Sequence, residues 1–352
     1  MGAMSRAEPL VLPIAPIRRR VAGALLGFGS LAVVTILLAP LAGSTPVDFV
    51  RAWNPSIPFE ANVDAQIFFI ARLPRVVAAA LVGSALAASG VVFQALLRNP
   101  LATPFTLGVS AGAALGAMLA ITAGVTLGVG PVGSVPLASF VGSLAAVGIV
   151  YALATARHRG FSTGVMLLAG VTLNSFFSAI ILFLQYLADM TQTMRTVRWL
   201  MGDLDVASYG PILAAAPLVA VALVAFAWLA RALNLLALGP EQAEARGVDT
   251  LRAQRIAFVS ASLATGAAVS VGGPVGFIGI VVPHLVRLIV GADHRVLLPA
   301  ASLFGATFLI GCDLVSRTVM APLELPVGIV TAVIGGPFFL WLLITRGAGG
   351  VR

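Results

Sequence analysis

The sequence predicts an all-α membrane protein with about ten transmembrane helices. Three observations predict this class: 59% of the 352 residues are hydrophobic, only 10% are charged, and the mean hydropathy is +1.05. A soluble domain carries about 25% charged residues, so the composition excludes an ordinary soluble enzyme, a disordered protein and a nucleic-acid-binding protein. A membrane span needs about 20 apolar residues, so this chain has room for roughly ten.

Ten apolar segments can be marked along the chain, and each is predicted to be a helix because open sheets cannot sit in lipid. The first follows Arg18-Arg19-Arg20, is long enough to span and lacks a small-residue cleavage site, so it is read as a helix and not as a signal peptide. We expect residues 1–17 to form a disordered cytoplasmic tail and residues 18–348 to form a single transmembrane domain. The segments are roughly 21–42, 73–97, 105–124, 133–156, 163–187, 210–233, 252–271, 275–291, 297–317 and 326–345.

The arginines predict the orientation of these segments. An even number of spans places both termini on one side of the membrane. All 21 basic residues are arginine, and with a cytoplasmic N-terminus 15 of them fall on the inner side and 6 on the outer side. Cytoplasmic loops carry the excess of positive charge, so both termini are predicted to be cytoplasmic.

Two outer loops are long, at about residues 43–72 and 188–209. The second contains Met190, Met194 and Trp199, spaced so that they are expected to form a short helix lying on the membrane surface.

The sizeable inner loop, about residues 234–251, is polar. Gly239-Pro240 can start a short helix there, and Gly247 can end it. A structured cytoplasmic loop on a membrane protein suggests a docking site for another protein.

Glycine is concentrated in two places. Gly108, Gly112 and Gly116 recur at four-residue spacing, which lets a neighbouring helix approach closely; packing within the chain is the expected role. The run 272–279 predicts a tight turn and a broken helix end between two spans. Such a break either lines a cavity, as in transporters, or is a kink without contact to substrate.

No catalytic or metal-binding set is present in the sequence. His158, His284 and His294 lack the spacing of metal ligands, so no metal or cofactor is expected. His284 and Arg287 share one face of a helix. A ligand-coordinating role for His284 is not favoured, because the sequence has no second residue at the spacing of metal ligands from it. The P-loop motif requires a lysine, and the chain has none. Any ATP that drives this protein must therefore be hydrolysed on another chain.

Several motifs, in this order, resemble those of the FecCD family of ABC importer permeases and cover about residues 65–345. Permeases for vitamin B12, haem and ferric siderophores are similar. The motifs are Arg72-Leu-Pro-Arg75, Asn99-Pro-Leu-Ala102, Leu107-Gly-Val-Ser-Ala-Gly112, Gly276-Phe-Ile-Gly-Ile-Val-Val-Pro-His-Leu-Val-Arg287, Asp293-His-Arg295 and Glu324-Leu-Pro-Val-Gly328.

This resemblance implies the type II ABC importer permease fold in the bacterial inner (cytoplasmic) membrane. It implies a homodimer with one path on its two-fold axis, two ATP-binding cassette ATPase subunits on the cytoplasmic side, and a periplasmic or lipid-anchored substrate-binding protein outside. The cargo would be a metal chelate, namely a ferric siderophore, haem or cobalamin. Membrane lipid is the remaining expected partner, and nucleic acid is not one.

The resemblance also assigns roles to individual residues. Arg72, Arg75 and Arg317 match the outer arginines that receive the binding protein. Two readings compete with that role: Arg72 and Arg75 as membrane-interface anchors, and Arg317 as a partner of Asp313, four residues earlier. Ser162 and Thr163 match a narrow inner gate. The residues matching the helix that presses into the ATPase are Glu241, Ala243, Glu244, Ala245, Arg246 and Gly247.

Two other classes of function remain open on the sequence. An ion-gradient-driven secondary transporter of a small hydrophilic solute would need a buried acidic residue, and Asp313 is the interior candidate. An intramembrane enzyme would need a nucleophile and a base on facing helices, which the histidines do not supply.

Overall fold

The computed structural model describes residues 16–347, except 125–127, 129, 131, 157–161 and 207. Within these residues every element is a helix, and a long helix overlaps each of the ten predicted segments. The all-α prediction is therefore confirmed. The ten helices are α1 (Ile17–Leu38), α4 (Leu73–Leu96), α5 (Val109–Thr122), α6 (Ser134–Thr155), α7 (Thr163–Leu187), α9 (Gly210–Leu236), α11 (Thr250–Gly272), α12 (Ile278–Val290), α13 (His294–Thr318) and α14 (Val327–Gly347).

Four shorter helices lie in the loops. α2 (Phe49–Ala52) and α3 (Val63–Gln66) lie in the first long outer loop. α8 (Met190–Leu200) is the predicted surface helix, and Asp189 caps it by accepting from the Gln192 N–H at 2.8 Å. α10 (Pro240–Glu244) is the predicted helix of the inner loop.

Seven helical stretches among the described residues are long and apolar enough to cross a membrane, and α5, α12 and the part of α14 at Val327–Leu342 are shorter apolar stretches. α5 is short because a 3₁₀ turn, Pro104–Leu107, precedes it. α12 is short because the chain turns back after Gly272, and Phe277 takes a left-handed conformation with φ 67° before the helix starts. Such irregular backbone is tolerated at membrane depth where protein surrounds it.

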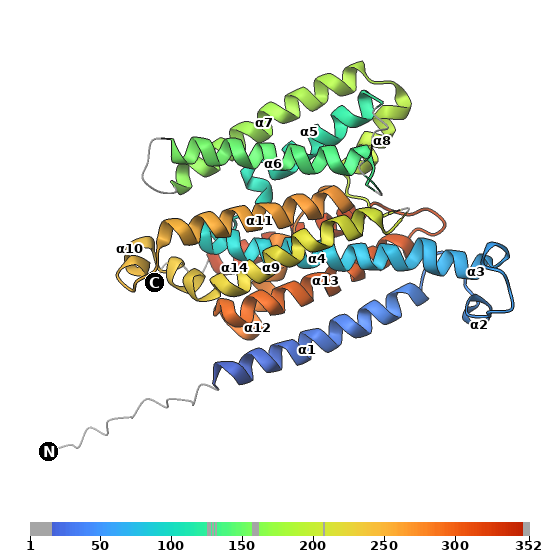
Figure 1. Ribbon diagram of the computed structural model, residues 1–352, viewed down its shortest axis with the longest axis horizontal. Helices are drawn as coiled ribbons and strands as arrows, with labels where there is room; N and C mark the ends of the chain where they lie inside the picture. The colour runs from blue at the N-terminus through green and yellow to red at the C-terminus, as the bar shows by residue number, and fades with distance from the viewer. Residues whose placement is uncertain are drawn as a thin grey trace.

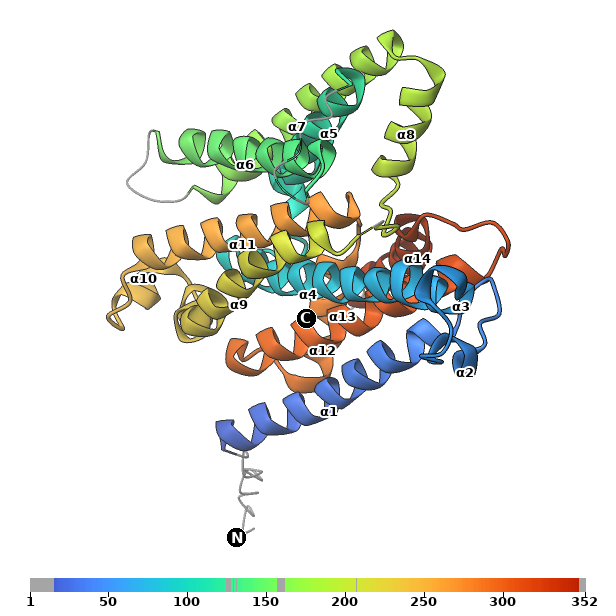
Figure 2. The same ribbon diagram turned by 45° about the vertical axis from the view of Figure 1, so that its right-hand side comes forward.

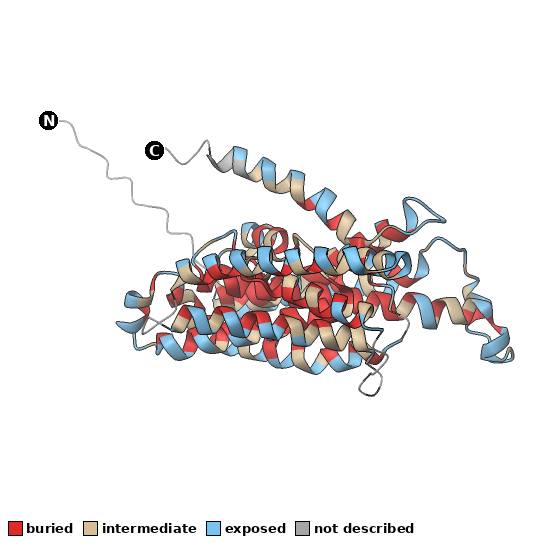
Figure 3. Ribbon diagram, turned by 90° about the horizontal axis from the view of Figure 1, so that it is seen from above, coloured by how far each residue is buried: buried red, intermediate tan, exposed pale blue. Residues whose placement is uncertain are grey.

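α4 is the central helix of the bundle. α9, α11, α12 and α13 pack around it, while α5, α6 and α7 form a second group that is joined to the first through α11 (Figures 1 and 2). α1 lies at the opposite edge, against α13. Buried residues gather in the middle of the bundle (Figure 3). The position of α4 explains why its residues are almost all small or apolar and buried.

The second span begins earlier than the sequence predicts. One helical stretch runs from Val63 to Leu96, through α3, a π-helical segment at Ile67–Arg72, and α4. Asp64 and Gln66 lower the hydropathy of its first turns, which is why the apolar pattern starts only at Leu73. As a result, Arg72 and Arg75 lie inside a continuous helix and not at its start.

Glycines allow the helices to come into backbone contact. A Cβ on Gly112 would lie 2.5 Å from the Gly142 carbonyl oxygen, and Gly116 faces the backbone of Ala138 in the same way. The stripe therefore packs α5 against α6, which confirms the predicted packing role for these two residues. Gly108 differs: it lies between the 3₁₀ turn and α5, where the backbone takes a left-handed conformation with φ +82°.

The run 272–279 is enclosed by protein. Gly273 has φ +64°, and a Cβ there would lie 2.6 Å from the Trp199 carbonyl oxygen. Gly335 of α14 lies against the Phe277 ring. The predicted tight turn is thus confirmed: Gly273 lets α8 approach it, and Gly335 lets α14 approach it.

We predict that Gly142→Leu destabilises the protein and that Gly148→Leu does not. Both residues lie on α6, but Gly142 touches the Gly112 backbone, whereas a Cβ on Gly148 meets nothing within 4 Å. Overpacking of a close contact costs on the order of 1–3 kcal/mol. Thermal unfolding in detergent measures the difference. Equal unfolding midpoints for the two variants would show that the α5–α6 contact is not tight.

Candidate functional site

A group of charged residues lies at one end of the bundle, where α1 and α13 end. We call it the outer arginine cluster, and it consists of Arg72, Arg75, Asp313, Arg317 and Glu324. The three arginines are the predicted docking residues. They come from three places in the chain: the π-helical segment, α4 and α13. Glu324 lies in the loop that leads to α14.

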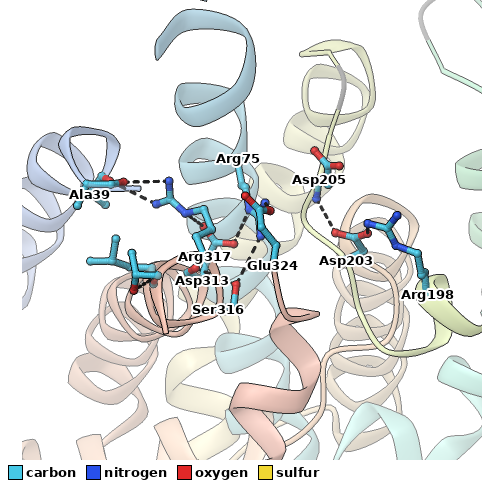
Figure 4. A network of polar contacts seen from close by, with 12 residues as sticks. Ala39, Arg75, Arg198, Asp203, Asp205, Asp313, Ser316, Arg317 and Glu324 are labelled. Carbon is cyan, nitrogen blue, oxygen red and sulfur yellow. Dashed lines mark hydrogen bonds and ion pairs between the residues drawn. The ribbon is translucent and has the colours of Figure 1, made fainter. Parts of the chain in front are cut away.

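Arg75 is at the centre of this cluster (Figure 4). Its Nε donates to Asp313 Oδ1 at 2.6 Å, and its guanidinium also pairs with the Glu324 carboxylate. A longer bond of 3.4 Å reaches the Ser316 hydroxyl. Arg75 therefore links α4 to α13 and to the loop before α14.

Arg317 pairs with the other oxygen of the same carboxylate, Nε to Asp313 Oδ2 at 3.0 Å. The alternative that Arg317 pairs with the residue four positions earlier is thus confirmed. Its remaining nitrogens donate to the carbonyls of Ala39 at 3.3 Å and Ala42 at 3.2 Å. Both carbonyls belong to the segment that follows α1, so Arg317 attaches that segment to α13.

Arg72 binds the same part of the chain. Its guanidinium donates to the carbonyls of Pro40 at 3.1 Å and Leu41 at 3.3 Å, and to the Thr45 carbonyl. Two arginines thus fix the segment that follows α1.

The three predicted docking arginines are buried in this chain: the exposed fractions of Arg72, Arg75 and Arg317 are 5%, 6% and 3%. Asp313 has no exposed surface. Charges removed from water in this way need partners, because an unpaired buried charge is costly. Their docking role stays a prediction, and the arginines already have partners within the chain.

Four members of the cluster, Arg72, Arg75, Arg317 and Glu324, line a cavity of about 730 Å³ that opens on the protein surface. Arg198 and Asp205 also line it. The side chain of Arg198 is 69% exposed and lies 3.7 Å from Asp203, so it is an accessible positive charge at this face (Figure 4). Sequence reasoning did not identify Glu324 as a partner of Arg75, because the two are 249 positions apart.

α10 lies at the opposite end of the bundle (Figure 1). Gly239 with φ 125° precedes it, and Gly247 with φ 82° follows it, as the sequence predicts. Ala243 is fully buried, and the Val248 N–H donates to its carbonyl at 3.0 Å. The other residues predicted to press into the ATPase are exposed: Glu241, Glu244, Ala245, Arg246 and Gly247.

Ser162 and Thr163, the predicted inner gate, begin α7. The Ser162 hydroxyl caps the helix by accepting from the Val165 N–H at 3.4 Å. Residues 157–161, which precede them and include His158, lie outside the described residues. The gate role therefore stays a prediction.

A second polar group, near α10, joins α9 to α13. The Asp293 carboxylate accepts from Asn234 Nδ2 at 2.9 Å and pairs with Arg295 at 2.6 Å. The hydrogen bond with Arg295 is the main cause that holds the pKa of Asp293 well below its ordinary value, and the bond with Asn234 adds to it. This carboxylate is therefore charged. On α12, Arg287 donates to Gln94 of α4 at 2.8 Å.

Comparisons with known proteins cover nearly the whole chain. The FecCD transport family matches residues 31–345. The hemin transport system permease protein HmuU of Yersinia pestis is 40% identical over 326 residues, 92% of this chain and 96% of that protein. The cobalamin import system permease protein BtuC of Halobacterium salinarum is 44% identical over 300 residues, 84% of this chain and 78% of that protein. A Helicobacter pylori permease named for iron chelatin transport is 39% identical over 278 residues, 78% of this chain and 82% of that protein.

A solved structure has a similar fold. It is a chain described as part of a metal-chelate type ABC transporter in an inward-facing conformation, with 32% identity and a TM-score of 0.77. The match covers 92% of this chain and 99% of that one.

We predict that Asp313→Asn lowers stability by about 3–5 kcal/mol, the usual cost of breaking a buried ion pair. The neutral amide would leave Arg75 and Arg317 without the carboxylate between them. Asp205→Asn is the matched control, because Asp205 lines the same cavity but is exposed. Thermal unfolding of the detergent-solubilised chain is the measurement. If Asp313→Asn and Asp205→Asn unfold alike, the cluster does not hold the helices together.

Proposed function

Because the chain belongs to the FecCD transport family, we propose that it is the permease of an ABC importer that carries a metal chelate across the bacterial inner membrane. ATP hydrolysis on two partner subunits would drive transport, and a second copy of this chain would complete the path. Relatives named for hemin, cobalamin and iron chelatin support the chelate class of cargo. Within that class the substrate-binding protein would select the cargo.

The geometry of α10 is the observation that carries this proposal. The helix and the turn after it present Glu241, Glu244, Ala245 and Arg246 to solvent, while buried Ala243 fixes the helix to the bundle. It also connects α9 to α11, and both of these helices pack against α4. A short exposed helix held in this way can enter a groove on a partner and pass a rigid-body displacement to the spans.

The outer arginine cluster supports docking of a binding protein at the other end. Its cavity combines the edges of three arginines with the exposed guanidinium of Arg198. Carboxylates on a partner would be attracted to it, and such complementarity mainly sets the rate and orientation of encounter. Arg72, Arg75 and Arg317 would contribute positive potential from within the wall, and Arg198 would make the first contact.

The homodimer and the inner gate complete the proposed path. α14 carries exposed Val333, Leu340 and Trp341, an apolar face that suits a second copy of the chain. Ser162 and Thr163 at the start of α7 would narrow the path on the cytoplasmic side.

A secondary transporter fits the site less well. Asp313 would have to bind and release the coupling ion, yet Arg75 and Arg317 occupy both of its oxygens. The charge of Asp313 therefore stabilises the contact between α4 and α13.

We predict that Ala245→Trp abolishes co-purification of the ATPase subunits and ATP-driven uptake of the chelate. Ala245 is exposed on the loop that would enter the groove, so a large ring there blocks docking without disturbing the core. Ala61→Trp is the control, because Ala61 is an exposed alanine in a short helix of the first outer loop. Unchanged co-purification and uptake with Ala245→Trp would contradict the assignment of α10.

A further inference from the structure

α1 is the least buried of the candidate spans, and a groove lies along each of two of its faces. The first groove, about 500 Å³, runs between α1 and α12 and includes Gly23, Gly27 and Ile289. The second, about 460 Å³, runs between α1, α9 and α13 and includes Leu25 and Phe226. Both are lined mainly by apolar side chains. Figures 1 and 2 show α1 at the edge of the bundle.

Positive charge gathers where both grooves reach the start of α1. Arg18 and Arg19 are exposed there. Arg20 lines the first groove and donates to the Val290 carbonyl at 2.7 Å. Arg295, whose side chain is 38% exposed, lines the second groove. Among the described residues, Arg295 of this group pairs with a carboxylate, that of Asp293.

We infer that these two grooves and their arginines form a binding site for one anionic phospholipid. The acyl chains would lie in the grooves on the two sides of α1, and the phosphate would accept hydrogen bonds from Arg18, Arg19 and Arg20. Guanidinium groups bind phosphate through paired N–H donors, and basic residues beside a span attract anionic lipids. A zwitterionic lipid would bring a cation to the same arginines and bind more weakly.

The site would complete the attachment of α1. The far end of the helix is fixed to the bundle by Arg317, through the Ala39 and Ala42 carbonyls. At the near end Arg20 donates to the Val290 carbonyl, and Val21 and Phe28 pack against the core. A bound lipid would join that end to α9, α12 and α13. This inference requires only that the chain spans a membrane, so it is independent of the cargo and of the ATPase.

Native mass spectrometry of the full chain, released from detergent with added phosphatidylglycerol or phosphatidylcholine, tests the site. We expect the wild-type chain to retain phosphatidylglycerol in preference. Arg18→Gln with Arg19→Gln should weaken that binding by about tenfold or more, since each arginine near a membrane surface contributes about 1 kcal/mol. Arg252→Gln with Arg255→Gln removes two exposed arginines of α11 and should leave the binding unchanged. Equal retention of the two lipids by wild type, or equal loss in both arginine variants, would overturn the site.

A second variant tests the grooves with the arginines intact. A Cβ on Gly23 or Gly27 meets nothing within 4 Å, so Gly23→Leu with Gly27→Leu fills the first groove without forcing the helices apart. Glycine is a poor helix former compared with leucine, so the variant should fold, and its thermal unfolding confirms this. We expect it to lose phosphatidylglycerol. Retention at the wild-type level would show that no acyl chain occupies the groove. The assay contains neither ATPase nor cargo, so its failure would leave the proposed permease function unaffected.

Discussion

At the outer end of the helix bundle, a carboxylate without exposed surface lies between two guanidinium groups. Asp313 pairs with Arg75 on one side and with Arg317 on the other. Through these two arginines the contact reaches α4, the end of α1 and the loop before α14. Such groups are stable away from water only when all of them are present, because any one left alone is an uncompensated buried charge. The positions of four parts of the chain at this end therefore depend on one carboxylate.

The rest of the bundle transmits that constraint to the opposite end. α4 contacts α9, α11 and α13 along its length, and glycine contacts bring backbones together, which leaves little room for independent sliding. At the inner end Asp293 and Asn234 join α13 to α9, and α10 connects α9 to α11. The outer cavity and α10 are thus connected through the same group of packed helices. A partner that displaces α10 would move these helices as a body, which is the simplest way for the two ends to communicate.

Local sequence patterns predict most of the helices. The apolar segments specified ten helices, and Gly239-Pro240 with Gly247 specified α10, because hydropathy and backbone conformational preference act over a few residues. The sequence did not reveal that the second span begins at Val63, since polar residues on its first turns hide the helix. Nor did it reveal the partners of Arg75, which are 238 and 249 positions away. Burial of Arg72, Arg75 and Arg317 likewise emerges only when α1, α4 and α13 come together. The spacing of Asp313 and Arg317 was the one local signal for the cluster.

We propose that transport through this chain takes its energy from ATP on partner subunits. The most direct measurement is uptake of haemin, cobalamin or a ferric siderophore into proteoliposomes that contain the chain. Each cargo would be offered with its binding protein, with the ATPase subunits present or absent. We expect uptake of one of these chelates only when the ATPase and ATP are both present, and none from an imposed ion gradient. Uptake driven by the gradient in vesicles without the ATPase would contradict it.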